Sequence, residues 1–469
     1  MSEAIVVGSG PNGLACAATL ASRGVAVTVI EAEQRIGGGT RSSELTLPGL
    51  IHDECSAFHP MAVGSPAYTE LALERHGLQW LWPEVDLAHP LDGGEGAAML
   101  RSLEATAAGL GAAGPDWERL FGPSVRGYDA LAGDIYRPLA HLPRHPLRLA
   151  RFGLAALMPA TVLARTLRTP QAKALFGGSA GHAFAPLGRP LSGAIAMALV
   201  SSGHRFGWPV ARGGSAAIAA AFAAAIEAHG GRIETGRPVR SLDELPTADA
   251  VVLDLSPAAV LELAGGRLPA RVARAYRRYR YGPAAFKLDL AVQGGIPWAY
   301  EPARRAGTVH AIGSLEELVV AEREIDRGRM PARPFVLVGQ QYLADPGRSR
   351  GDLHPIWAYA QVPSRYGGDA TEAVLDQIER FAPGLRERIV SQAVRTPAEI
   401  EARNANLIGG DIACGANTAR QMLFRPRLGL DPYATGIPGV FICSAATPPG
   451  AGAHGICGYN AAQAVLRSF

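Results

Sequence analysis

The stretch AIVVGSGPNGLACAATLASRGVAVTVIEAE, residues 4–33, decides the fold of the N-terminal part of the chain. It opens with a short apolar strand and continues into the glycine-rich turn GSGPNG (8–13). A helical pattern of small apolar residues follows and ends at Gly24. A second apolar strand (25–30) then ends at Glu31. Strand, glycine turn, helix and strand in this order predict a βαβ unit with a dinucleotide-binding turn.

Each glycine of the turn has a separate task in such a site. Gly8 permits the tight turn, Gly10 lets the backbone approach a pyrophosphate, and Gly13 lets the helix pack closely on the strand. Glu31 is placed to accept the hydroxyls of a ribose, and an acid at this position disfavours a 2′-phosphate. The predicted cofactor-binding residues of this unit are Gly8, Gly10, Pro11, Asn12, Gly13, Glu31 and Ala32.

The segment after Glu31 distinguishes FAD from NAD. A second glycine cluster, with hydroxyl groups and a cation, follows one short loop later in IGGGTRSSELTLPGLIHD (36–53). That arrangement suits a cofactor whose diphosphate and ribityl chain run onward across the fold. The sequence therefore predicts FAD, with contacts from Gly38, Gly39, Thr40 and Arg41.

The chain ends with a second strand, turn and helix pattern, in GVFICSAATPPGAGAHGICGYNAAQAVL (439–466). Residues 432–466 contain no Lys, Arg, Asp or Glu. Pro438, Pro448, Pro449 and the many glycines exclude a continuous membrane-spanning helix. A strand followed by a glycine-rich turn and a helix N-terminus is instead typical of a segment that receives part of a bound cofactor.

With these motifs in place, the chain resembles the FAD-dependent phytoene desaturase-like oxidoreductases, within the broader amine oxidase-type flavoproteins. The resemblance is closest to the pyridine nucleotide-disulphide oxidoreductase domain-containing protein 2-like branch. It rests on GSGPNG with Glu31, on the segment 36–53, and on NLIGGDIACGANTARQMLFRPR (406–427) with 439–466. The chain lacks paired active-site cysteines, so the "disulphide" of the branch name does not transfer.

The resemblance implies an α/β fold in which a Rossmann-like FAD-binding domain of the glutathione reductase type is interleaved with an α+β substrate domain. The FAD domain is expected from 1–75, 206–284 and 401–469, and the substrate domain from 76–205 and 285–400. The relatives also imply further FAD contacts, at Val239 near the adenine, Ser444 and Ala445 near the diphosphate, and Gly452, Ala453, Gly455 and Ile456 under the pyrimidine edge. The FAD is expected to be non-covalent, with a covalent bond to Cys457 as the less favoured alternative.

The residues between the motifs supply the candidates for substrate binding and catalysis. By analogy with the family, His59 lies beside the flavin ring and His454 beside its pyrimidine edge, so both are candidate acid/base groups. For each, a structural role is the favoured alternative. Ser56, Arg212, Gly213 and Gly214 are expected near the substrate cavity.

The middle of the chain carries weaker signals. Strands are expected at 232–235, 238–241, 251–255 and 286–292, with neighbours in PFVLVGQQYL (334–343) and IWAYAQVP (356–363). In the stretch 137–170, Arg and His alternate with Leu, Phe and Met on a helical region broken by proline. A lid or cavity-lining helix with solvated arginines is the favoured interpretation, ahead of a membrane-surface patch.

Composition excludes several other classes of protein. The net charge of +3 over 469 residues gives no reason to invoke nucleic acid, and no metal-ligand spacing is present. The five cysteines form no C-x-x-C pair and no signal peptide precedes the first strand, so a reduced, cytoplasmic protein is expected.

The leading functional hypothesis is an FAD-dependent oxidoreductase, a dehydrogenase or desaturase, that takes a hydride from a largely apolar small substrate such as an isoprenoid, a lipid or a secondary metabolite. An FAD-dependent isomerase or hydratase, an amine oxidase, and a non-catalytic flavin-binding scaffold are the alternatives.

Overall fold

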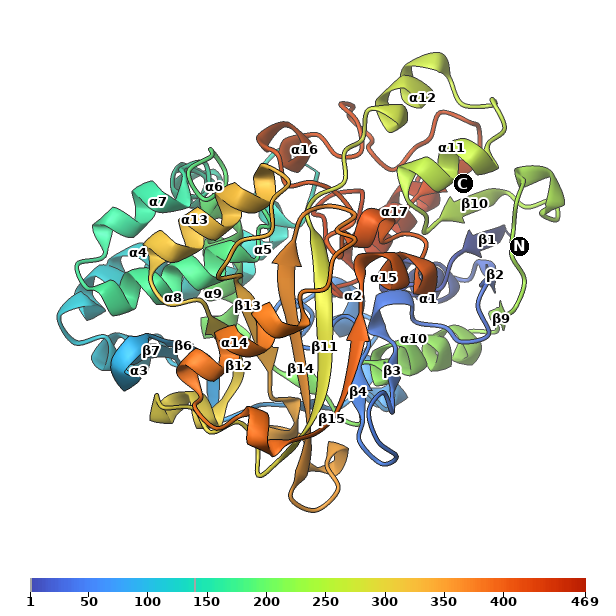
Figure 1. Cartoon of the computed structure of the whole chain (residues 1–469). Helices are drawn as coiled ribbons and strands as arrows, with labels where there is room; N and C mark the ends of the chain where they lie inside the picture. The colour runs from blue at the N-terminus through green and yellow to red at the C-terminus, as the bar shows by residue number, and fades with distance from the viewer. Residues whose placement is uncertain (1, 139–140) are drawn as a thin grey trace.

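Two sheets and a layer of helices make up the molecule (Figure 1). The computed structural model describes residues 2–138 and 141–469. In Figure 1 a parallel sheet lies at the right, a long mixed sheet runs through the centre, and most of the helices of the first insert lie at the left.

The parallel sheet is the predicted Rossmann-like unit. Its strand order is β16-β10-β1-β2-β9, and every pairing is parallel. The strands are β1 (Glu3–Val7), β2 (Ala26–Ile30), β9 (Arg232–Glu234), β10 (Ala250–Leu253) and β16 (Val440–Ile442). Strands buried on both faces need apolar side chains throughout, and the apolar runs in β1, β10 and β16 meet that need. The helices packed on this sheet are α1 (Pro11–Ala21), α10 (Ala216–Ala228) and α17 (Ile456–Leu466).

The central sheet has seven strands in the order β15-β11-β14-β13-β12-β6-β7. Only β12 and β6 pair in parallel, and the other neighbours are antiparallel. Its strands are β6 (Val85–Pro90), β7 (Gly96–Met99), β11 (Ala284–Gln293), β12 (Ala306–Ala311), β13 (Val336–Gly339), β14 (Leu353–Val362) and β15 (Ile389–Arg395). The expected strands at 286–292 and in the two neighbouring segments are therefore confirmed.

The remaining helices pack on the two sheets, with α11 (Pro257–Leu263) and α12 (Ala270–Arg277) against the parallel sheet, and short strands join other parts of the chain. The helices of the first insert are α3 (Leu103–Gly109), α4 (Gly114–Arg126), α5 (Tyr128–Ile135), α6 (Pro146–Ala156), α7 (Ala160–Leu163), α8 (Pro170–Gly181) and α9 (Gly193–Phe206). The others are α2 (Pro66–Thr69), α13 (Leu315–Asp326), α14 (Thr371–Phe381), α15 (Pro397–Arg403) and α16 (Ala419–Leu423). Two antiparallel pairs join β3 (Ser42–Ser43) to β4 (His52–Asp53) and β5 (Trp80–Leu81) to β8 (Val210–Ala211).

One expected strand is absent. Residues 238–241 form no strand, so their predicted pairing with β9 is wrong. β9 pairs with β2 instead, and Pro238 has no N–H to donate to a sheet. The chain leaves β9 through a bond from the Arg237 N–H to the Glu31 carbonyl, at 2.9 Å.

The strands of the two sheets follow the expected division of the chain. Those of the parallel sheet fall within 1–75, 206–284 and 401–469, and those of the central sheet within 76–205 and 285–400, apart from the first residue of β11. The domain boundaries themselves stay a prediction.

Among the described residues, no single helix is long and apolar enough to cross a membrane. One pair, Pro146–Ala156 with Ala160–Thr166, passes the same test by length and composition when taken together, and its two halves meet at 95°. Residues 139 and 140, which belong to the basic, leucine-rich stretch 137–170, lie outside the described part of the chain.

Candidate functional site

The glycine turn has the geometry that a pyrophosphate requires. Gly8 has a φ of 98°, which favours glycine, and it follows directly on β1. Gly10 is the N-cap of α1 and has no side chain of its own to cap the helix, and the Asp254 carboxylate binds the Gly13 N–H of the first turn. A Cβ at Gly13 would lie 2.2 Å from the Gly8 carbonyl oxygen, so only glycine lets α1 approach the turn this closely. The turn and the helix end form an open cradle of N–H donors.

Glu31 lies beside this cradle. Its carboxylate accepts the backbone N–H of Ser9 at 2.8 Å, the Ser9 hydroxyl, and the N–H of Glu33 at 2.9 Å. The side chain is only 8% exposed, and it lines the same cavity as the cradle. Arg41 closes the wall next to it, where its guanidinium donates to the carbonyls of Arg35, Ile36 and Arg403. Arg41 therefore fixes the glycine loop as well as facing the cavity.

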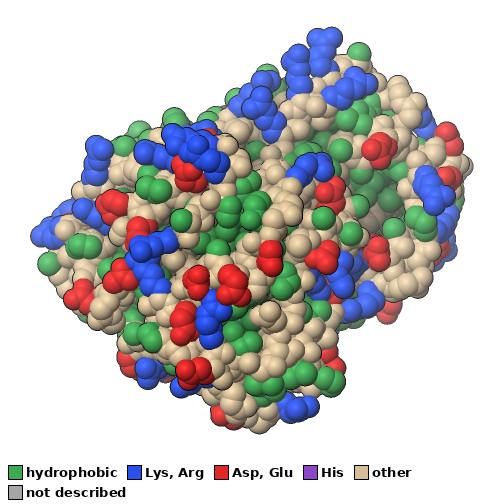
Figure 2. Space-filling view, in the orientation of Figure 1, with side chains coloured by type: hydrophobic (Ala, Val, Ile, Leu, Met, Phe, Trp, Pro, Cys, Tyr) green, Lys and Arg blue, Asp and Glu red, His purple; other side chains and the backbone are tan. Residues whose placement is uncertain are grey.

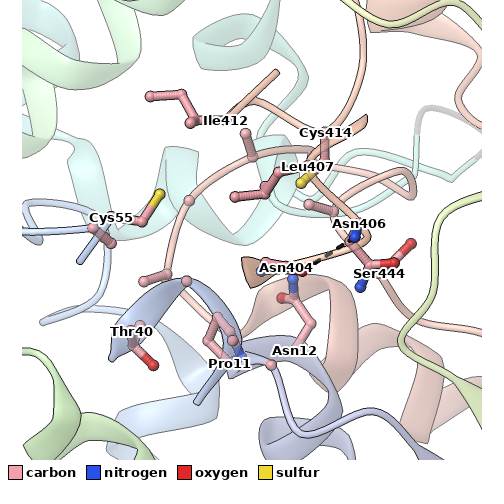
Figure 3. Close-up of a pocket in the computed structure, with 18 of the residues that line it drawn as sticks. Pro11, Asn12, Thr40, Cys55, Asn404, Asn406, Leu407, Ile412, Cys414 and Ser444 are labelled. Carbon is pink, nitrogen blue, oxygen red and sulfur yellow. Dashed lines mark hydrogen bonds between the residues drawn. The ribbon is translucent and has the colours of Figure 1, made fainter. Parts of the chain in front are cut away.

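A continuous cavity of about 460 Å³ runs from the cradle to the central sheet. Sixteen of the predicted site residues line it. They are Gly8, Gly10, Pro11, Asn12, Glu31, Ala32, Gly38, Gly39, Thr40, Arg41, Ser56, Val239, Ser444, Ala445, Gly452 and Ala453. Figure 3 shows how Pro11, Asn12 and Thr40 approach this space from one side and Ser444 from another. Segments from both ends of the chain thus meet around one cavity.

Three predicted cofactor residues lie behind the cavity wall. Gly13 is turned to the Gly8 carbonyl and to Asp254. Gly455, with a φ of 66°, is the N-cap of α17, where a Cβ would press on Ala15 and Ala67. Ile456 is fully buried. These residues shape the wall and do not face the cavity.

Arg212, Gly213 and Gly214, expected near the substrate cavity, are not among the residues that line the cavity described above. The Arg212 side chain donates to Gln79 at 2.7 Å, and the Gly213 N–H donates to Asp345 at 2.7 Å. A Cβ at Gly214 would lie 2.5 Å from the Ser42 hydroxyl. The segment is held in place by a buried ion-pair cluster in which Arg348 contacts Asp53 at 2.6 Å and Asp345 at 3.1 Å.

The two candidate histidines are both buried outside the cavity. His59 Nε2 shares a hydrogen bond of 3.1 Å with the Ser215 hydroxyl, and His454 Nδ1 accepts the Ile456 N–H at 3.1 Å. Burial lowers the pKa of each imidazole to about 4, so both are neutral near pH 7. Each ring fixes a loop that contributes neighbouring residues to the cavity.

The far end of the cavity is formed by aromatic and aliphatic side chains of the insert. Trp357 and Tyr359 project from β14 with ring centroids 5.0 Å apart and planes at 86°. Phe184 stacks on Tyr359 at 5.9 Å. Ile195, Leu199, Trp208, Thr308 and Leu337 complete this end. Its lining contains no Asp or Glu, since the acidic lining residues Glu31, Glu33 and Asp254 all lie at the cradle end.

One histidine does face the cavity, and the sequence did not single it out. His182, which ends α8, shares a 2.9 Å hydrogen bond between its Nε2 and His310 Nε2 on β12. Its Nδ1 has no partner among the described residues, while the ring lines the cavity. Burial lowers the pKa of His182 to about 4. A neutral imidazole thus offers one nitrogen to the cavity, and the sequence holds no local signal for it because its partner lies 128 residues away.

Asp254 is the second residue that sequence reasoning missed. It follows β10 directly, and its Oδ2 accepts the Gly13 N–H at 3.0 Å under the cradle. Burial raises its pKa to about 7. Asn406 binds this strand end at two points, through the Asp254 carbonyl and the Ser256 N–H. Figure 3 shows Asn404 and Asn406 together on the cavity wall, joined by a hydrogen bond. The sequence signal that could have identified Asp254 is its place as an acidic residue directly after an apolar strand.

All five cysteines are free thiols. Cys55 and Cys414 line the cavity, whereas the Cys457 thiol donates to the carbonyls of Thr447 and Gly450 behind it. Burial raises the pKa of Cys457 to about 11. Among the residues that the structure describes, no group of three or more His, Cys, Asp or Glu side chains could hold a metal ion.

The residues present fit FAD. The cradle offers N–H donors to a pyrophosphate, and Glu31 offers a carboxylate next to it. The cavity is lined by Val239, by the glycine cluster at Gly38 and by the apolar chamber of the insert. The second glycine cluster and the C-terminal turn both line this cavity. A nicotinamide dinucleotide bound at the first glycine turn would not need either segment.

Comparison with known proteins agrees with this geometry. Residues 6–70 match the NAD(P)-binding Rossmann-like domain family. The whole chain aligns with pyridine nucleotide-disulfide oxidoreductase domain-containing protein 2 of Rattus norvegicus, at 23% identity over 548 residues and 94% of that protein. It aligns with the neurosporene-forming phytoene desaturase of Cereibacter sphaeroides at 26% identity, over 99% of this chain and 94% of the desaturase.

Among solved structures, a variant of putrescine oxidase shares the fold with a TM-score of 0.64 at 16% identity, over 100% of this chain and 99% of the oxidase. The chain is thus an oxidoreductase with a Rossmann-like domain for FAD, and over its full length it is similar to phytoene desaturase and to pyridine nucleotide-disulfide oxidoreductase domain-containing protein 2.

Proposed function

We propose that this protein is an FAD-dependent dehydrogenase or desaturase that removes a hydride from a largely apolar small molecule, such as an isoprenoid, a lipid or a secondary metabolite. FAD, when bound, supplies the hydride acceptor at N5. The chain's own residues bind the dinucleotide, exclude water from the chamber and hold the substrate.

The observation that carries the proposal is the composition of the chamber beyond the cradle. Phe184, Ile195, Leu199, Leu337 and Trp357 give it an apolar lining, with His182 and Tyr359 as polar points. Such a wall favours apolar substrate surface because burial of that surface is the main gain on binding.

The same chamber argues against a charged amine as substrate. A perpendicular aromatic pair, Trp357 and Tyr359, is present, and the putrescine oxidase fold makes amine oxidation the natural alternative. An ammonium group taken from water into this chamber would, however, find no carboxylate among the residues that line it. A dication such as putrescine is therefore disfavoured.

His182 is the proposed proton acceptor. The residue lines the chamber and its Nε2 is held by His310, so the ring is oriented and neutral. When the substrate gives up a hydride from one atom and a proton from another, Nδ1 takes the proton. The hydrogen bond to His310 then stabilises the imidazolium that forms.

Anaerobic mixing of the flavin-loaded protein with substrate classes tests the proposal. Apolar alcohols, isoprenoids and long-chain lipids are compared with putrescine and a monoamine, and the loss of flavin absorbance is measured. Bleaching by a member of the apolar set alone supports the proposal. Bleaching by amines alone would establish the amine oxidase alternative. Full reduction by dithionite, but by no organic donor, would point to an isomerase, a hydratase or a scaffold.

A further inference from the structure

The surface of α6 and of the corner that follows it is unusually apolar for an exposed helix. Of the twelve exposed large hydrophobic side chains in the described part of the chain, five lie between residues 142 and 158. They are Leu142 at 92%, Leu147 at 86%, Leu154 at 72%, Leu157 at 52% and Met158 at 38% exposure. Scattered exposed leucines are ordinary, but a local concentration of them marks a surface that meets another apolar phase.

The charge of the same region has one sign. Between Asp134 and Glu227 the chain contains ten Lys and Arg residues and no Asp or Glu. On the exposed side of the α6 region, Arg144, Arg148, Arg151 and Arg165 form no ion pair with any carboxylate of the described residues, whereas Arg168, further along, pairs with Asp116. In Figure 2, Lys and Arg side chains gather along the upper left margin, where Figure 1 places α6, α7 and α13, with hydrophobic side chains and some Asp and Glu between them.

The opposite face of α6 is anchored in the protein core. Phe152 and Ala156 are buried against Ala196, Met197 and Val200 of α9. At the corner, a Cβ at Gly193 would lie 2.6 Å from Leu163 of α7, so the α6–α7 bend sits tightly on the start of α9. The exposed leucines are therefore displayed by a supported helix.

One helix separates this surface from the substrate chamber. The residues Ile195 and Leu199 of α9 line the chamber, and α6 packs on the same helix. A helix with its side chains is only about 10 Å thick. The α6 surface thus lies directly over the apolar end of the cavity.

We propose that the surface formed by residues 142–158, the α6 surface, docks on an anionic lipid bilayer, with the leucines inserted at the level of the headgroups and acyl chains and the arginines bound to the headgroup phosphates. An amphipathic helix with leucine on one side and arginine around it has the pattern of an interfacial helix. For the stretch 137–170 the sequence favoured a lid or cavity-lining helix with solvated arginines over a membrane-surface patch. The structure favours the membrane-surface patch for residues 142–158, because their leucines as well as their arginines face outward. Docking on a bilayer would bring an apolar substrate close to the chamber. Only this consequence, and not the docking itself, rests on the proposed function.

A protein partner is the other class of occupant, and the observations favour lipid. The exposed side chains are aliphatic and cationic with no acidic residue among them, and anionic lipid satisfies both at once.

Vesicle co-sedimentation of the full chain tests the docking. The probes are extruded vesicles of phosphatidylcholine alone and of phosphatidylcholine with 30 mol% phosphatidylglycerol. Binding is expected to the mixed vesicles only, weakening as NaCl rises from about 0.1 M to about 0.5 M. The double variant Leu147→Glu with Leu154→Glu should bind at least about 100-fold more weakly, since burial of each leucine is worth a factor of about ten or more.

Matched variants separate the contributions. Arg144→Gln with Arg151→Gln should lower the affinity about fivefold per arginine and leave the residual binding less sensitive to salt. Val390→Glu, at an aliphatic residue that is 57% exposed on β15, should bind as the unaltered protein does. Failure to bind either vesicle, or equal loss in the Val390 variant, would overturn the proposal. Neither result bears on flavin binding, which is read separately from the absorption of the same samples.

Discussion

The Asp254 carboxylate accepts the backbone N–H of Gly13 at 3.0 Å, which ties the end of β10 to the first turn of α1 directly under the cradle. Two segments 241 residues apart in the chain are joined at this point. The shape of the cradle therefore depends on the close packing of α1 against β10 as well as on the glycine turn.

Gly13→Ala should destabilise the protein. The added Cβ would lie 2.2 Å from the Gly8 carbonyl oxygen and 2.9 Å from the Asp254 carboxylate, so α1 must move away from the sheet. Overpacking of this kind costs about 1–3 kcal/mol in the free energy of unfolding. Chemical denaturation measures the loss. The control is Gly133→Ala in α5, where a Cβ meets open space and helix propensity should add about 0.5–1 kcal/mol. Equal stability of the two variants would contradict the packing argument.

Asp254→Asn should remove a pH dependence of stability. Burial raises the pKa of Asp254 to about 7, so between its ordinary value and 7 the folded protein binds a proton that the unfolded chain releases. Stability from this group is thus present at low pH and is lost as the pH rises toward 7. The variant, which stays neutral, should melt higher than the unaltered apoprotein at pH 8, and the difference should be clearly smaller at pH 5. A difference that is the same at both pH values would rule out this titration.

His182→Gln should slow reduction of the flavin by substrate about 10²–10⁴-fold and leave reduction by dithionite unchanged. Because burial lowers the pKa of His182 to about 4, the base is active above that value, and the rate in the unaltered protein should fall as the pH drops through about 4. The variant should lack this limb of the pH profile.

His310→Phe and His229→Gln sharpen that test. Loss of the 2.9 Å bond in the first should shift the pH limb and lower the rate, because His182 loses the group that orients it. The second, at an exposed histidine, should change nothing. A variant at residue 182 with full activity and an unchanged profile would show that the proton goes elsewhere.

Cys457→Ala should retain its flavin as the unaltered protein does, with the cofactor released by acid in both. The thiol is turned to two backbone carbonyls, and burial raises its pKa to about 11, so it is a poor nucleophile at neutral pH. Acid precipitation followed by spectroscopy of the pellet and the supernatant measures this. Flavin that stays with the precipitated protein, and no longer does so in the variant, would overturn non-covalent binding.

The sequence predicted the parallel sheet and the cradle because each is encoded locally. The strand of Ala4–Val7, the glycines and Glu31 lie within 30 residues, and the spacing alone places them. The strand predicted at 238–241 is absent from the structure. That prediction was wrong because pairing at the edge of a sheet depends on a partner strand that sequence patterns do not reveal.

The substrate chamber could not be predicted in the same way. His182, Thr308 and Trp357 come from α8, β12 and β14, and only tertiary packing brings them to one wall. Conversely, His59 and His454 lie close to the predicted loops, but hydrogen bonds to Ser215 and to the backbone turn their rings away from the cavity. The position of each histidine next to a motif therefore predicted its loop correctly but could not predict the direction of its side chain.

The central claim is that the cavity holds FAD, and the absorption spectrum of the purified protein, recorded before and after acid precipitation, tests it most directly. The account predicts the absorption bands of oxidised flavin in the purified protein and release of intact FAD into the supernatant. A colourless protein that also takes up no added FAD would contradict the account.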